Sequence, residues 1–166
     1  MSEASKRKGF GILETVLASA LIAGSLYALA SVLLLAGSAI EIARERLAAS
    51  FLVEEGMEVL RHRRDAGWDA NIANLTPGQD YYVSFDAGMG SWSISASPEP
   101  VIEGLFLRRF RVERVSRDMG ANIELPYNPA NEDSETRKII VAVTWTHKNS
   151  PHAMTLEGYL MDIFND

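Results

Sequence analysis

The chain has 166 residues, of which 47% are hydrophobic, and its 16 lysine and arginine residues against 22 aspartate and glutamate residues give a net charge of -6. This length accommodates one domain of about 100–150 residues and an additional segment. The absence of cysteine excludes a disulfide framework, thiolate ligands for zinc and a thiol nucleophile. The acidic balance argues against a dedicated nucleic-acid-binding protein, because neutralising phosphates requires a basic surface.

An uncharged segment, residues 15–40, lies near the N-terminus. As a helix it would extend roughly 39 Å at about 1.5 Å per residue, which is enough to cross a hydrocarbon core of about 30 Å. The apolar stretch of a secretory signal peptide is shorter, about 7–15 residues. Lys6, Arg7 and Lys8 precede the segment and predict a cytoplasmic N-terminus with the C-terminal body outside. We therefore expect a single-pass membrane protein with a transmembrane helix over residues 10–40.

Glu14 stands at the cytoplasmic edge of this helix, after a run of uncharged residues that begins at Gly9. A carboxylate at the centre of a bilayer costs about 2.5–3.5 kcal/mol, and less near the interface. Two interpretations follow from this position. Either Glu14 extends to the cytoplasmic head groups, or its charge is neutralised by a cationic partner.

The stretch Lys6-Arg7-Lys8-Gly9-Phe10-Gly11-Ile12-Leu13-Glu14 resembles the class III leader of type IV prepilins. In that family a prepilin peptidase removes a short basic leader after its glycine, and the new N-terminal residue is N-methylated. The resemblance implies a leader of residues 1–9, cleavage between Gly9 and Phe10, and N-methylation of Phe10. It also implies that Glu14, the fifth mature residue, meets the N-terminal amine of a neighbouring subunit during filament assembly. Such a pair would specify the register of two subunits, because each charge is costly in an apolar environment unless it is paired.

Two departures from the family pattern are Gly11, where threonine is common, and Ser31, in the region where many major pilins carry proline. The chain also lacks the C-terminal cysteine pair of many major pilins. The resemblance therefore implies a minor pilin or a pseudopilin, with other pilin subunits, an assembly ATPase and an inner-membrane platform protein as partners. The precursor would reside in the inner (cytoplasmic) membrane before it enters a pilus or pseudopilus. A subunit of the type II secretion pseudopilus and a single-pass anchored binding domain are the alternatives.

Beyond the uncharged segment the helical pattern continues as an amphipathic stretch, residues 41–66. Apolar residues near a three- and four-residue spacing predict one buried stripe, formed by Phe51, Val53, Met57 and Leu60. Basic residues 61–64 suit the negative end of the helix dipole, and residues 65–67, which end in glycine, supply a stop. A helix from Phe10 to about Arg64 would extend roughly 80 Å.

Residues 67–166 are expected to form an antiparallel β-sheet head, which together with the helix gives an α+β fold of the pilin type. The candidate strands, bounded by Gly, Pro, Asn or Asp, are Tyr81 to Phe85, Trp92 to Ser95, Leu105 to Val115, Lys138 to His147 and Met154 to Ile163. In the fourth of these, the apolar residues at 139, 141, 143 and 145 share one face, which we expect to pack on the helix. A turn over residues 148–152 would close a terminal hairpin similar to that of minor pilins and pseudopilins.

The sequence carries no motif for catalysis or for cofactor binding. Its histidines, His62, His147 and His152, lack metal-ligand spacing, and it has neither a nucleophile elbow nor a phosphate-binding glycine loop. We therefore expect no enzyme activity, no cofactor and no metal centre, and we expect His147 and His152 to flank a solvated turn. The acidic loop 128–135 offers oxygen ligands for calcium but lacks the spacing of an EF-hand, so a solvated loop is the expectation.

Arginines are concentrated in and just after the third candidate strand: Arg108, Arg109, Arg111, Arg114 and Arg117. Phe106, just before these arginines, and Phe110, among them, give a combination that would suit single-stranded DNA. Against this interpretation, Arg108 and Arg109 point to opposite faces of a strand, and the chain is acidic. We therefore expect these arginines to be solvated or paired with carboxylates, and we do not expect DNA as a partner.

Overall fold

The computed structural model describes residues 11–98 and 101–164. Within these residues it contains one long helix and five strands: α1 (Ile12–Asp65), β1 (Asp80–Asp86), β2 (Ser91–Ser95), β3 (Leu107–Ser116), β4 (Glu132–His147) and β5 (Ser150–Met161). A π-helical turn, Asp69–Ala73, follows α1, and a 3-10 turn, Pro129–Asn131, precedes β4. The chain divides into two compact units, one ending at Arg44 and the other beginning at Glu45, so α1 contributes to both.

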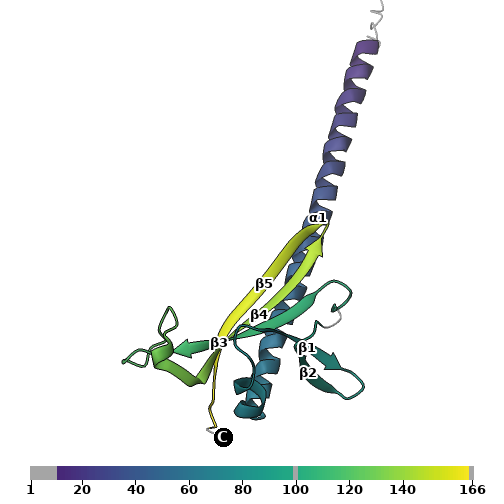
Figure 1. Cartoon of the computed structure of the whole chain (residues 1–166). Coiled ribbons are helices and arrows are strands. Elements are labelled where there is room, and N and C mark those ends of the chain that lie inside the picture. The colour runs from purple at the N-terminus through teal and green to yellow at the C-terminus, as the bar shows by residue number, and fades with distance from the viewer. Residues whose placement is uncertain (1–10, 99–100, 165–166) are drawn as a thin grey trace, which may run out of the picture. The chain divides into compact units, whose positions relative to one another are not determined.

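The strands of the second unit form one antiparallel sheet in the order β2-β1-β3-β4-β5. Figure 1 shows this sheet, with β4 and β5 as its longest pair, beside the C-terminal part of α1. The residues of α1 after Glu45 pack on one face of the sheet and share a hydrophobic core with it. The predicted α+β class, a long N-terminal helix packed on a C-terminal antiparallel sheet, is therefore confirmed.

The core lies between α1 and the inner face of the sheet. On the helix its buried residues are Ala49, Val53, Met57 and Leu60, and on β4 they are Ile139, Val141, Val143 and Trp145. The predicted inner face of the fourth strand is thus confirmed, whereas the predicted place of Phe51 in the buried stripe is wrong, because its side chain is 62% exposed. Phe51 follows Ala49 by two residues, which at 3.6 residues per turn places it on the opposite side of the helix.

Gly56 lies where α1 packs tightly on the sheet. A Cβ atom at this position would lie 2.9 Å from Cγ1 of Val141 on β4 and 3.1 Å from Cδ of Arg108 on β3. The first distance is shorter than real Cβ contacts, so any larger residue would push the helix away from the sheet. Glycine is therefore required here by space, although it is a poor helix former.

We expect Gly56→Ala to lower the free energy of unfolding of the second unit by about 1–2 kcal/mol, because overpacking outweighs the gain of about 1 kcal/mol in helix propensity. The measurement is urea denaturation of the full chain in detergent, followed by tryptophan fluorescence. Gly37→Ala is the matched control, since a Cβ at Gly37 has no heavy atom within 4 Å. Equal effects of the two substitutions would contradict the close approach.

Two turns set the ends of the main elements. Helix α1 ends at Asp65, one residue beyond the expected end, and Gly67 has a φ of 136°, which other residues rarely adopt. The turn between β4 and β5 is tighter than predicted, because Lys148 and Asn149, with φ of 46° and 66°, form a two-residue connection. Two successive residues with positive φ are typical of a type I′ turn, whose twist matches that of the strands, so pairing extends to Ser150.

Candidate functional site

The helix of the first unit has an exposed apolar surface. The first buried residue of α1 is Ala49, and side chains such as Leu13 and Leu34 are 82% and 78% exposed. The helix is long and apolar enough to cross a membrane, and none of its most apolar stretch is buried. Contiguous apolar surface of this extent is unfavourable in water, so the uncharged residues 15–40 are compatible with a single-pass membrane anchor.

The serine and threonine side chains of this helix form hydrogen bonds within the helix itself. Each serine and threonine of residues 15–40 donates its hydroxyl hydrogen to a backbone carbonyl three or four residues earlier, from Thr15 to Ile12 and from Ser19, Ser25, Ser31 and Ser38 to the preceding turn. A hydroxyl that is satisfied inside its own helix needs no water and no partner helix. The segment therefore presents almost no unsatisfied hydrogen-bonding groups to an apolar surrounding.

Glu14 is the exception on this surface. It lies in the first turn of α1, where its backbone N–H donates to the carbonyl of Gly11 at 3.0 Å. The side chain is exposed, and no residue in the described part of the chain forms a hydrogen bond or an ion pair with its carboxylate. The remaining predicted site residues, which are Lys6, Arg7, Lys8, Gly9 and Phe10, lie outside the described residues. Among residues 11–98 and 101–164, the structure therefore gives the position of Glu14 but no partner for its carboxylate.

Glu45, at the start of the second unit, joins α1 to the end of β4. One of its carboxylate oxygens accepts a hydrogen bond from Nε1 of Trp145 at 3.0 Å, and the other lies 2.8 Å from Nδ1 of His147. His147 lies beside the exposed turn 148–149, as expected, but its own side chain is only 11% exposed. The hydrogen bond with His147 is the main cause that holds the pKa of Glu45 below its ordinary value, and the Trp145 hydrogen bond acts in the same direction. His152, stacked on Trp145, adds a weaker favourable charge.

Because the pKa of Glu45 is lowered on folding, its stabilising contribution is present above its ordinary pKa of 4.5 and is lost as the pH falls through the lower folded value. We therefore expect Glu45→Gln to lower the unfolding temperature at neutral pH and to have progressively less effect as the solution is acidified towards about pH 3. Circular dichroism of the full chain in detergent measures this difference. Glu54→Gln, on an exposed position of the same helix, is the control, and a pH-independent effect of Glu45→Gln would contradict the assignment.

The arginine-rich strand is a set of ion pairs. Arg108 pairs with Glu55, Arg109 and Arg111 share Asp80, Arg114 pairs with Glu132, and Arg117 pairs with Asp133. Arg108 points into the core and Arg109 to the opposite face, as the alternation of the strand predicts. The predicted pairing with carboxylates is confirmed, and each of these charges is compensated within the head.

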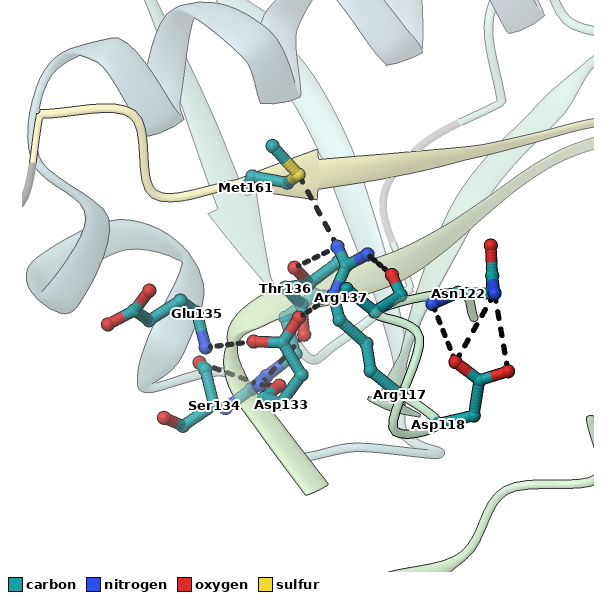
Figure 2. A network of polar contacts seen from close by, with 10 residues as sticks. Arg117, Asp118, Asn122, Asp133, Ser134, Glu135, Thr136, Arg137 and Met161 are labelled. Atoms are coloured by element: carbon teal, nitrogen blue, oxygen red, sulfur yellow. Dashed lines mark hydrogen bonds and ion pairs between the residues drawn. The ribbon is translucent and has the colours of Figure 1, made fainter. Parts of the chain in front are cut away.

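The acidic loop 128–135 extends into the start of β4, and two of these arginines, Arg114 and Arg117, bind its carboxylates. Figure 2 shows Arg117 between Asp133, Thr136 and Met161, with hydrogen bonds of 2.6 Å to the carboxylate and 3.3 Å to the hydroxyl. Glu132 accepts a hydrogen bond from Tyr127 as well as from Arg114, so the first two acids of β4 are already engaged. Within residues 11–98 and 101–164, no three histidine, cysteine or acidic side chains come together in a way that would hold a metal ion.

Comparison of the chain with protein-family models, with curated protein sequences and with solved structures returns no match.

Proposed function

We propose that the chain is a structural subunit of a type IV pilus-like filament, of the minor-pilin type, held in the membrane by its N-terminal helix before assembly. The observation that carries the proposal is the exposed apolar helix, which begins with a carboxylate that has no partner in the described part of the chain. Neighbouring helices of the same kind would cover the apolar surface once the subunit leaves the lipid. A neighbouring N-terminal amine would neutralise Glu14 in that packing.

In this proposal a prepilin peptidase cleaves between Gly9 and Phe10, which creates the amine that Glu14 requires. An assembly ATPase and a platform protein then move the subunit from the bilayer into the filament. The contacts between subunits are heterologous, since the amine of one subunit meets the glutamate of another. Such contacts repeat along an open helix and generate a filament instead of a closed ring.

A subunit of the type II secretion pseudopilus would use the same N-terminal chemistry, and the two assignments differ in the location of the filament. A single-pass anchored binding domain is the remaining alternative. It would need the apolar helix but neither cleavage nor a partner for Glu14. Processing at Gly9 therefore separates the assembly functions from the anchor, and recovery of the subunit from surface filaments separates the pilus from the pseudopilus.

The test is the mass of the N-terminal peptide of the protein, recovered from sheared surface filaments and from membranes of the native host. A peptide that begins at N-methylated Phe10 and is abundant in the filament fraction is the expected result. The same processed peptide confined to the cell envelope would favour the pseudopilus. An intact leader in membranes alone would overturn the proposal in favour of the anchored domain. A bulky residue in place of Gly9 is the control, because it should leave the precursor uncut.

A further inference from the structure

One edge of the sheet is a long strand with a free side. β5 is the last strand in the order β2-β1-β3-β4-β5, and Figure 1 shows it, in yellow, at the margin of the sheet beside β4. It has 12 residues and pairs with β4 from Ser150 to Met161 without a register shift. Most strands have about 5–6 residues, so this edge is unusually long. The filament function proposed above does not use it.

The direction of each backbone N–H group of β5 follows from the turn that precedes it. The two-residue turn places His147 opposite Ser150, and the pair that flanks such a turn exchanges both backbone hydrogen bonds. Every second residue from Ser150 onwards therefore bonds to β4, and Asp162 continues this series, because its N–H donates to the Glu135 carbonyl at 2.9 Å. The residues between them direct their N–H groups away from β4: Ala153, Thr155, Glu157, Tyr159 and Met161. Within residues 11–98 and 101–164, no other element accepts hydrogen bonds from these groups.

The edge also lacks the features that usually prevent pairing with another chain, which are lysine, inward-pointing charges, bulges and proline within the strand. Among the Asp, Glu, Lys and Arg residues, β5 contains only Glu157, and its carboxylate is bound by Lys138 of β4 at 2.9 Å. Its one proline, Pro151, lies next to the turn. The opposite edge of the sheet, β2, has only 5 residues. β5 is therefore the open edge of the head.

The inner face of β5 brings the hydrophobic core to this edge. Met154 and Leu156 are partly buried and pack against the core. At Gly158 a Cβ atom would lie 3.2 Å from Cε of Met57, so α1 passes directly beneath the strand. A further strand beside β5 would place its own inward side chains next to Met154 and Leu156 and would remove more of their apolar surface from water.

We propose that β5 binds an extended segment of a partner protein, which adds to the sheet as an antiparallel strand. A peptide backbone is the chemistry that matches a row of alternating N–H and carbonyl groups, and the neighbouring side chains then select the sequence. The bound segment has apolar residues at every second position, facing inward beside Met154 and Leu156, and polar residues between them.

A second copy of the chain is a poor occupant of this edge. α1 and β5 run in the same direction, because Glu45 contacts His147 beside the turn and Met57 lies beneath Gly158 further along both elements. Antiparallel pairing of two β5 strands is twofold symmetric, which would place the two copies of Glu45 at opposite ends of the pair. A single-pass anchor, with which the N-terminal helix is compatible, requires both heads to be entered from the same side. The partner strand therefore comes from a different protein.

The test uses the full chain in detergent micelles, labelled with ¹⁵N, and two N-methylated forms of the peptide acetyl-Lys-Thr-Val-Thr-Ile-Thr-Val-Thr-Lys-amide. One form is methylated at the valine and isoleucine nitrogens, and the other at the threonine nitrogens. In antiparallel pairing, the apolar residues lie opposite Met154 and Leu156 and direct their N–H groups away from β5, whereas the threonine N–H groups point towards it. The first form therefore keeps the hydrogen bonds to β5 and the second loses them.

We expect the first form to slow hydrogen–deuterium exchange of the Thr155 and Glu157 amides by at least about tenfold, saturably, and the second form to leave exchange unchanged. No saturable protection, equal protection by both forms, or protection by the second form alone would overturn the proposal. If concentrating the chain alone protects these amides and the peptide does not compete, the edge is an interface between copies and the proposal fails.

Thr155→Pro locates the binding. Proline removes an N–H group that faces away from β4, so pairing within the hairpin can persist while the ring blocks the edge. We expect this variant to weaken binding of the first peptide form by at least about tenfold, measured on the Tyr159 amide. Thr155→Val is the matched control, because it changes the same side chain and keeps the N–H group. Unchanged binding by Thr155→Pro would contradict the proposal, and if this variant unfolds the hairpin, the two peptide forms still decide on the native chain.

Because this test reads the head alone, its result does not depend on processing at Gly9. A processed filament subunit with an inert edge would overturn only the strand addition, whereas an unprocessed anchor that binds the first peptide form would overturn only the filament function.

Discussion

Replacing Arg108 with alanine is expected to lower the free energy of unfolding of the second unit by about 3 kcal/mol. The guanidinium is buried, and its removal leaves the carbonyls of Leu52 and Val83 without these donors. The aliphatic stem also packs against Gly56, so alanine would leave a cavity at this tight contact between helix and sheet. Glu55 adds less to the loss, because its half-exposed carboxylate can be hydrated once its partner is gone.

Two further substitutions separate the causes of this loss. Arg109→Ala removes the neighbouring arginine on the outer face, whose ion pair with Asp80 is partly exposed, and should cost about 0–1 kcal/mol. Arg108→Met keeps most of the stem without the charge, and should restore more than half of the stability lost in Arg108→Ala. Urea denaturation of the full chain in detergent measures all three. Equal losses for Arg108→Ala and Arg109→Ala would mean that burial of Arg108 does not contribute to stability.

The elements with strong apolar periodicity could be predicted from the sequence. Helix α1 was expected to end near Arg64 and ends at Asp65, and the apolar inner face of β4 was expected at the residues that are buried. These patterns indicate burial, because apolar residues recur at helical spacing, or alternate with polar ones along a strand, where one face of the element is buried. The opposite faces of Arg108 and Arg109 followed from the same alternation, whereas Arg114, next to the irregularity in β3, is exposed although alternation would place it on the face of Arg108.

The first part of β4, residues 132–137, was not expected to be a strand. It is polar throughout, yet it pairs with β3 across an irregularity between Arg114 and Val115, and Thr136 is 2% exposed. This segment is held by Arg117 and by the hydrogen bonds of Arg137 to backbone carbonyls. Because it lacks alternating apolar residues, its sequence pattern does not predict a strand. Strand pairing that depends on distant polar partners is not readable from local sequence.

The core beneath the end of α1 contains residues between Gly67 and Tyr81, where no helix or strand is predicted from the sequence. Trp68 and Ile72 are 4% and 0% exposed, and the π-helical turn of Asp69–Ala73 directs them inward. Their spacing of four residues is a helical signal that was available in the sequence. Glu45 is different, since its partners Trp145 and His147 are 100 and 102 residues away, and nothing local predicts which of the many acids of α1 they bind.

The two units therefore satisfy their apolar surfaces in different ways. The second unit buries its own stripe of α1 against the sheet and fixes it with Glu45 and Arg108. The apolar stretch of α1 in the first unit is exposed, and its serine and threonine hydroxyls form hydrogen bonds within the helix. Glu14 precedes the uncharged residues 15–40 of that helix, and in the proposed filament it is the group that distinguishes helix packing in a defined register from simple immersion in lipid.

Glu14→Ala is accordingly expected to leave membrane insertion and cleavage after Gly9 largely unchanged, because it lowers the cost of placing the helix in lipid. Incorporation into filaments should fall by at least about tenfold, since an N-terminal amine without its partner in an apolar packing costs about 3–5 kcal/mol. The measurement is the ratio of the subunit in sheared filaments to that in membranes, determined by quantitative mass spectrometry. The N-terminal peptide in both fractions reports cleavage in the same experiment.

Thr15→Ala is the matched control, because it alters the adjacent residue, whose hydroxyl donates only to the Ile12 carbonyl of its own helix. Incorporation of this variant should be normal, and Glu14→Asp, which keeps the charge on a shorter side chain, should fall between the two. If Glu14→Ala fails to enter filaments and Thr15→Ala enters normally, the defect is due to the lost charge and not to a general disturbance of the helix. Only the Glu14 substitution removes the partner of the neighbouring amine. Normal incorporation of Glu14→Ala would remove the role of Glu14 in register while leaving the apolar helix as the assembly surface.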